Sequence, residues 1–236
     1  MSAEPVVPDR RQRRRQETME EVLDHAVEIM AEQGVAGLSV GEVARRMGIR
    51  PPSLYGYFPS KNALYDALFE RGARLILEHF RAEAETVDLQ GRSLSDVLLQ
   101  SAESFVGWSI ENVAYTQLLF WRPVPGFAPS AEAYEPAVEL VELSRGWFSG
   151  LQQQGLIRPD ADIDDVMRDW TVLTAGVVSQ QMANAPGEPL ATGRFTAALP
   201  DLVAMFARHY GTGGDTETNT PTSTPRPKEA RRVRNR

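Results

Sequence analysis

Residues 39–61 (SVGEVARRMGIRPPSLYGYFPSK) constrain the fold of this chain more than any other stretch. Gly48 follows a short run with helical spacing, and we expect it to end that helix with the positive φ that glycine adopts without strain. Pro51 and Pro52 then suit the first turn of a second short helix, because their fixed φ fits there and an N–H group would be unpaired. The pattern predicts a helix–turn–helix, which holds one short helix outward from a small core. Such a helix can enter a DNA major groove.

Helical periodicity continues through the rest of the chain. Residues 17–33 place apolar side chains on one face, and Gly34 ends the pattern. Ser39 with Glu42 predicts a capping box for the first helix of the pair, and Ser60 is expected to cap the helix that follows the pair. Further helices are predicted over 61–85, from Ser93 or Ser95 to 111, and over 115–121, 131–154, 164–184 and 194–209. No alternating strand pattern of useful length occurs, so the predicted fold class is all-α.

The net charge of −7 is unevenly distributed along the chain. Residues 62–210 carry a net charge of −10, whereas residues 1–61 balance to zero and contain the dense basic cluster RRQRRR at positions 10–15. A basic end beside an acidic remainder is expected when one end of a protein meets phosphate. We therefore expect a DNA-contacting arm with Arg13 and Arg14 as candidate contacts; a solvated, disordered tail is the alternative.

Composition limits the other classes of function. The chain has no cysteine, which excludes disulfides, thiolate metal sites and a cysteine nucleophile. No apolar run approaches the roughly 18 residues of a membrane helix, and the basic N-terminus has no apolar core after it. We therefore expect a cytoplasmic protein without a membrane partner.

Nothing in the sequence indicates catalysis. His25, His79 and His209 each stand alone on a predicted helix, with no carboxylate pair or glycine-rich phosphate loop beside them. The acidic run at 160–165 lacks the glycine and the distal glutamate of a calcium loop, so we interpret it as the start of a helix. We expect no enzyme activity, no metal site and no cofactor.

The N-terminal motifs resemble the TetR family of bacterial transcriptional regulators. An amphipathic helix ending in Glu-Gln-Gly is followed by LSVGEVARRMGI and then by SLYGYFPSKNAL. The positions that follow the family signature are Ala44, Gly48, Leu54, Tyr55, Phe58, Ser60, Lys61 and Leu64. The resemblance implies a three-helix DNA-binding domain with a helix–turn–helix, and C-terminal helices that dimerise and enclose a small-molecule pocket. It also implies that ligand binding releases the operator.

These observations predict four segments. Residues 1–15 are expected to form a disordered basic arm and residues 16–62 the helix–turn–helix domain. Residues 63–210 are expected to form a helical regulatory and dimerisation domain, and residues 211–236 a disordered tail. The predicted function is that of a ligand-responsive repressor. The alternative is a TetR-like regulator without a ligand, acting as a constitutive repressor or an activator.

Exposed side chains of the second short helix are candidates for reading DNA. Arg50 at its start can bond a guanine in bidentate fashion, which is worth about 1–3 kcal/mol of discrimination, or can remain a solvated charge. Pro51 and Pro52 can offer only apolar contact to a thymine methyl group. Ser53 can reach a base or a phosphate. Phosphate contacts are expected from Ser39, Tyr55, Tyr57 and Lys61.

Gly41 and Tyr57 limit the number of DNA contacts that this surface can make. Many members of the resembled family place a polar or basic side chain at the position of Gly41, and here none is available. Base reading must then depend on Arg50 and the following turn, or on the basic arm entering the minor groove. Tyr57 can alternatively pack over the turn.

The second half of the chain is predicted to hold the ligand and the dimer interface. A concave apolar site lined by aromatic rings is a common form of ligand pocket, although aromatic residues at helical spacing also form ordinary cores. The candidates are Trp108, Tyr115, Phe120, Trp121, Phe127, Trp147 and Trp170, and the expected effector is apolar or aromatic.

The last two predicted helices are expected to form a four-helix interface in a homodimer, with Ala175 and Gly176 allowing close approach. The apolar residues assigned to these helices are Val166, Trp170, Leu173, Val177, Phe195, Leu199, Leu202, Val203 and Phe206. Such a dimer is expected to bind a palindromic operator in double-stranded DNA.

Overall fold

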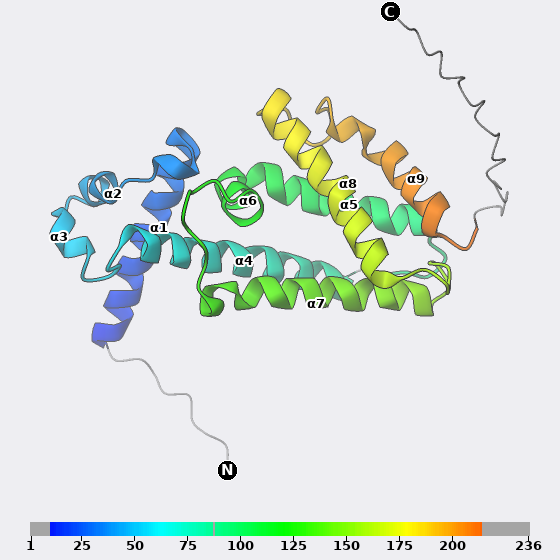
Figure 1. Cartoon of the computed structure of the whole chain (residues 1–236), viewed down its shortest axis with the longest axis horizontal. Helices are drawn as coiled ribbons and strands as arrows, with labels where there is room; N and C mark the ends of the chain where they lie inside the picture. Colours follow the sequence, from blue (N-terminus) through cyan, green and yellow to red (C-terminus); the bar gives the residue numbers. More distant parts are fainter. Residues whose placement is uncertain (1–9, 87, 214–236) are drawn as a thin grey trace, which may run out of the picture.

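The computed structural model describes residues 10–86 and 88–213 of the chain. Its elements are α1 (Arg10–Gln33), η1 (Val35–Gly37), α2 (Val40–Arg46), α3 (Pro51–Leu54), α4 (Lys61–Thr86), α5 (Leu94–Glu111), α6 (Val113–Phe120), α7 (Ala131–Gln153), α8 (Ile163–Asn184), η2 (Thr196–Ala198) and α9 (Leu199–Tyr210). Over these two ranges the extended pairing consists of one isolated bridge, between Ile157 and Gly211. The predicted all-α fold class is confirmed. Figure 1 shows α1, α2 and α3 grouped at one end and α5 to α9 forming the remainder, with α4 running from one group into the other.

The helix–turn–helix forms as the sequence predicts. Gly48 has a φ of 66° in the turn after α2, and α3 opens on the two prolines. The predicted cap at Ser60 is confirmed, because its Oγ accepts a hydrogen bond of 3.0 Å from the backbone N–H of Ala63. Tyr65 is fully buried below this region and donates to the carbonyl of Val35 at 2.7 Å. The short helices are therefore held on a core that α1 and α4 supply.

The capping box predicted at Ser39 and Glu42 is wrong. Ser39 precedes α2 with an extended backbone, but its side chain forms no cap hydrogen bond. The Glu42 carboxylate instead accepts hydrogen bonds from Arg45 at 2.7 and 2.8 Å and from Arg46 at 3.2 Å. Charge-assisted bonds are stronger than those to a neutral N–H group, which explains the choice. The hydrogen bonds from Arg45, and then from Arg46, lower the pKa of Glu42 to about 2.

The predicted basic arm needs a correction. Residues 10–15 form the first turns of α1, where a disordered segment was expected, and residues 1–9 lie outside the described part of the chain. Arginine and glutamine are good helix formers, so α1 extends through them. Arg15 also gains tertiary contacts. Its Nη1 donates to the carbonyl of Gly56 at 3.2 Å, and its guanidinium lies 5.2 Å from the ring centre of Tyr57.

Helix α4 connects the two halves of the molecule. The domain boundary predicted between residues 62 and 63 falls within α4, which continues without a break and runs beside α7 (Figure 1). At the start of α7, Ser130 donates to Asp66 through its backbone N–H (2.7 Å) and its hydroxyl (2.6 Å). A displacement of one end of α4 can therefore be transmitted to the other along a single helix.

The remaining boundaries differ little from the prediction. Ser93 caps α5 in a capping box with Asp96, which decides between the two predicted starts. The final helix begins later than expected, at Leu199, because the turn η2 precedes it and Pro200 lies in its first turn. Of the predicted tail, residues 214–236 lie outside the described part. Within the described ranges, no helix combines the length and the apolar character that a membrane crossing requires.

Candidate functional site

The outer surface of α3 is available to a partner. Arg50 immediately precedes this helix with an extended backbone and is exposed, as are Pro51, Pro52 and Ser53. Arg50 forms no ion pair or side-chain hydrogen bond with any residue that the structure describes. Tyr55 at the end of the helix is 50% exposed. A free guanidinium at a helix start, beside small and apolar side chains, is an arrangement suited to a base edge in a major groove.

Two further predicted contacts flank α3. Ser39 is exposed before α2, and Lys61 is exposed at the first residue of α4. The ammonium group of Lys61 lies 3.5 Å from the carbonyl oxygen of Ala36 and 5.4 Å from the ring centre of Tyr65. Both predicted contacts therefore lie at helix N-termini, where a phosphate can be bound.

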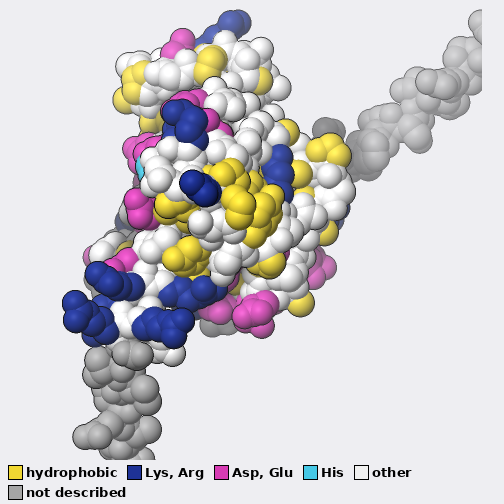
Figure 2. Space-filling model, turned by 90° about the vertical axis from the view of Figure 1, so that its left-hand side faces the viewer, with side chains coloured by type: hydrophobic (Ala, Val, Ile, Leu, Met, Phe, Trp, Pro, Cys, Tyr) yellow, Lys and Arg dark blue, Asp and Glu magenta, His cyan; other side chains and the backbone are white. Residues whose placement is uncertain are grey.

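Tyr57 occupies a different position from Tyr55. It is half-buried and packs against the core of the N-terminal helices, with the guanidinium of Arg15 above its ring. The structure thus gives Tyr57 the packing position that the sequence left open as an alternative. Arg15 is engaged at the same place, while Arg13 and Arg14 are exposed on α1. Figure 2 shows Lys and Arg side chains gathered at the start of the described chain, next to an apolar patch.

Arg46 differs from the exposed arginines Arg13 and Arg14 because its side chain is mostly buried. Only 17% of its side chain is exposed, and its guanidinium bonds to Glu32 at 3.0 Å, to Glu42 at 3.2 Å and to Glu28 at 3.4 Å. The hydrogen bond from Arg46 is the main cause that lowers the pKa of Glu32. These bonds join α2 to α1, so we assign Arg46 to orienting the helix–turn–helix and not to contacting DNA.

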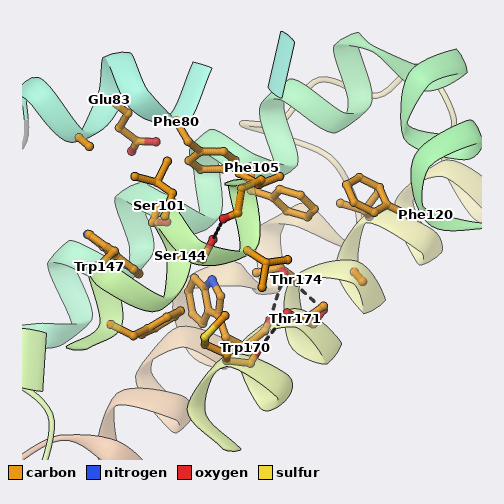
Figure 3. Close-up of a pocket in the computed structure, with 18 of the residues that line it drawn as sticks. Phe80, Glu83, Ser101, Phe105, Phe120, Ser144, Trp147, Trp170, Thr171 and Thr174 are labelled. Atoms are coloured by element: carbon orange, nitrogen blue, oxygen red, sulfur yellow. Dashed lines mark hydrogen bonds between the residues drawn. The ribbon is translucent and has the colours of Figure 1, made fainter. Parts of the chain in front are cut away.

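A cavity of about 400 Å³ lies among α4, α5, α6, α7 and α8. Most of its wall is apolar, and Figure 3 shows aromatic side chains around it. Trp147 and Phe148 meet edge to face with ring centres 4.7 Å apart, and Phe105 contacts Phe120 at 5.8 Å. A small-molecule site with these features binds an apolar or aromatic ligand. The aromatic lining consists of Phe80, Phe105, Phe120, Trp121, Trp147, Phe148 and Trp170.

Known proteins resemble this chain in the helix–turn–helix and in the overall fold. Residues 22–68, which span the helix–turn–helix, match the family model for bacterial regulatory proteins of the tetR family. The helix–turn–helix region of this chain is therefore similar to that of the tetR family of bacterial regulatory proteins. The uncharacterized HTH-type transcriptional regulator YobS of Bacillus subtilis (strain 168) is 31% identical over 98 residues, which cover 42% of this chain and 49% of YobS. The chain spans about half the length of the curated relatives it matches.

Solved structures extend the likeness in fold across both halves of this chain. A protein of unknown function from Rhodococcus sp. RHA1 aligns with a TM-score of 0.68 at 18% identity, over 89% of this chain and 100% of that one. The regulator FadR from Bacillus subtilis, solved in complex with stearoyl-CoA, aligns with a TM-score of 0.60 at 16% identity, over 80% and 97%. At these identities the likeness shows the fold.

Four of the seven aromatic residues predicted for the pocket line the cavity. These four are Phe120, Trp121, Trp147 and Trp170. Trp108, Tyr115 and Phe127 were assigned wrongly, since they pack in the hydrophobic cluster of the N-terminal helices. Tyr115 lies on the side of α6 away from the cavity, and burial raises the pKa of its hydroxyl to about 12.

The cavity also contains residues that the sequence did not single out. Phe80, Phe105 and Phe148 complete its aromatic wall, and Glu83 contributes a carboxylate. Phe80 and Glu83 lie in the second half of α4. Their spacing is compatible with a solvent-facing or a core-facing position, so sequence periodicity could not assign them to a cavity.

The predicted dimer residues need a similar correction. The large apolar side chains of α8 and α9, including Val166, Val177, Val203 and Phe206, are buried in the chain's own core. The outward faces of these helices carry other residues. Val172 is 68% exposed and Met205 is 58% exposed.

Proposed function

We propose that this chain is a homodimeric, ligand-responsive transcriptional repressor that acts on DNA in the cytoplasm. The observation that carries the proposal is the continuity of α4 between two sites. Lys61 at one end of this helix adjoins the helix–turn–helix, while Phe80 and Glu83 near the other end line the cavity. A ligand that moves the wall of the cavity would therefore change the position of the DNA-binding helices.

The cavity favours ligand control over the alternative of a constitutive regulator. A concave, mostly apolar space of about 400 Å³ falls in the range of small-molecule sites. The structural relative FadR was solved with stearoyl-CoA, so a protein of this fold binds a small molecule. We propose that the effector of this chain occupies the corresponding helical domain and that its binding releases the operator.

The proposed dimer uses the outer faces of α8 and α9. Val172 and Gly176 are exposed one turn apart on α8, and Met205 is exposed on α9. Exposed apolar residues beside a glycine allow close helix packing, and two such helices from each protomer form a four-helix interface. A two-fold dimer would present two copies of α3 to a palindromic operator.

The proposed function is tested by footprinting the purified protein on the DNA that flanks its own gene. We expect protection of two half-sites whose centres are about one helical turn, or a multiple of it, apart on one face of the duplex. A screen for compounds that abolish the footprint then identifies effectors. Absence of any sequence-specific protection, in that DNA and in a library of random sequences, would contradict the proposal.

Arg50→Ala and Lys61→Ala are expected to have different effects on DNA binding, the first on sequence preference and the second on overall affinity. Arg50→Ala should relax the preference at one or two base pairs by about tenfold, since a bidentate contact to guanine is lost. Lys61→Ala should instead weaken binding to all sequences by similar factors, because phosphate contacts carry no sequence information. Affinities for a set of operator variants separate the two effects. A uniform loss for Arg50→Ala would exclude its role in base reading.

Replacing Arg13 and Arg14 by glutamine should reduce the salt dependence of DNA binding. Each phosphate contact that is lost lowers the slope of log K against log salt by about one. The slope is measured by titrations between low and moderate salt. Arg168→Gln is the matched control, because Arg168 pairs with Asp165 on α8, in the opposite half of the molecule. An unchanged slope in the double variant would show that the start of α1 does not touch the DNA.

A further inference from the structure

The wall of the cavity carries a single kind of formal charge. Among the described residues that line it, Glu83 is the only one with an ionisable side chain, and all others are apolar, aromatic or hydroxyl-bearing. Figure 3 shows Glu83 and Phe80 on the same helix at the edge of the cavity. The spacing of three residues places both side chains on one face of α4. A negative charge is therefore presented next to an aromatic wall.

The Glu83 carboxylate has no hydrogen-bond or ion-pair partner among the described residues. Its Oε2 atom is buried and accepts no hydrogen bond from any described residue. The nearest basic residue along α4 is Arg81, and its guanidinium pairs with Glu139 on α7, where both side chains are about half exposed. A buried carboxylate oxygen without a donor is energetically costly, so it marks a position where a bound group would be favourable.

The hydroxyl groups of the cavity add acceptors and not donors. Thr116 donates to the carbonyl of Ser109 at 3.0 Å, and Ser144 donates to that of Leu140 at 2.9 Å. Thr171 and Thr174 likewise donate to carbonyls one turn earlier in α8, at 2.8 and 3.0 Å. Each hydroxyl thus keeps only oxygen lone pairs for a ligand. Apart from Ser101 and the indole N–H groups of the tryptophans, the polar groups that line the cavity can only accept hydrogen bonds from a ligand.

We propose that the cavity takes an organic cation, namely a molecule with an apolar or aromatic body and a positively charged nitrogen or phosphorus centre. The inference deepens the proposed function, since it assigns a charge to the effector of the same cavity. The cationic centre lies against Glu83 and the face of Phe80, where a carboxylate and an aromatic ring both attract positive charge. The apolar body contacts the aromatic wall around Trp147 and Phe148.

A pair of ions with the same shape and opposite charge tests the proposal. Tetraphenylphosphonium and tetraphenylborate differ mainly in the sign of their charge, so apolar contacts contribute similarly to both. Calorimetric titration of the full chain, without DNA, should give an affinity for tetraphenylphosphonium at least about tenfold higher than for tetraphenylborate. Equal affinities, tighter binding of the borate, or no binding of the phosphonium would overturn the proposal.

Glu83→Gln localises the effect. This variant keeps the size of the side chain and should lower the affinity for tetraphenylphosphonium about tenfold, while the affinity for tetraphenylborate stays equal or rises. Glu85→Gln is the matched control, because Glu85 is exposed on the same helix and does not line the cavity. The control matters because residues 62–210 carry a net charge of −10, which attracts any cation. Equal losses in both variants would overturn the assignment to Glu83.

The result can be separated from the proposed function. Calorimetry without DNA reports only on the cavity, whereas the footprint reports on operator binding and its release. Specific footprints combined with no charge preference in the cavity would overturn the cation and leave the regulator in place. A preference for the phosphonium that depends on Glu83, in a protein that protects no DNA, would support the cation site and contradict the regulator.

Discussion

Leu54→Ala is expected to abolish operator binding. Leu54 is fully buried and is the one buried residue of α3, so it attaches this four-residue helix to the core. Truncating a buried leucine costs about 2–5 kcal/mol, because transfer energy is lost and a cavity remains. That loss is a large part of the roughly 5–15 kcal/mol that stabilises a typical domain. Because α3 has no second buried side chain of its own, we expect it to lose its position at this cost.

Denaturant unfolding and operator affinity together measure this effect. Leu75→Ala is the matched control, since Leu75 lies on α4 with 38% of its surface exposed and its truncation should change stability by no more than about 0.5 kcal/mol. Ligand binding in the cavity should survive Leu54→Ala, because Leu54 does not line the cavity. Retention of wild-type operator affinity by Leu54→Ala would show that α3 is held by something other than its buried side chain.

The helix–turn–helix could be predicted because its determinants are local. Gly48 needs no distant neighbour to favour a positive φ, and Pro51 and Pro52 favour a helix start by their own geometry. The capping box at Ser39 failed for the opposite reason. Its acceptor, the Glu42 carboxylate, had Arg45 and Arg46 as stronger partners, and Arg46 is in turn held by two glutamates of α1. Competition of that kind depends on tertiary packing.

The lining of the cavity was only partly predictable, because helical periodicity does not show in which part of the protein an apolar side chain packs. Trp108 and Trp147 have equally apolar surroundings in the sequence, yet one packs with the N-terminal helices and the other lines the cavity. Tyr115 and Thr116 are neighbours on α6, yet Tyr115 packs in the hydrophobic cluster of the N-terminal helices while Thr116 lines the cavity. Glu83 was missed because a charged residue near a helix end is ordinarily solvated. Only the fold shows that Glu83 lines the cavity.

Helices α4 and α6 pack against each other. Gly72 on α4 is buried against the ring of Tyr115 on α6, and a Cβ atom at this glycine would lie 2.6 Å from Cδ1 of that ring. Helix α6 also contributes Thr116 and Phe120 to the wall of the cavity. The contact between Gly72 and Tyr115 thus joins α6, which lines the cavity, to α4, which begins next to the helix–turn–helix.

Gly72→Ala should therefore destabilise the protein and weaken the response of the operator complex to ligand. Overpacking a buried contact costs about 1–3 kcal/mol, which exceeds the gain of up to about 1 kcal/mol when alanine replaces glycine in a helix. Tyr115→Leu removes the obstructing ring, so in that background Gly72→Ala should become neutral or stabilising. The change of sign is measured by a double-mutant cycle of unfolding free energies. If Gly72→Ala destabilises both backgrounds equally, the cost does not arise at Tyr115, and α4 is not held against α6 by this close approach.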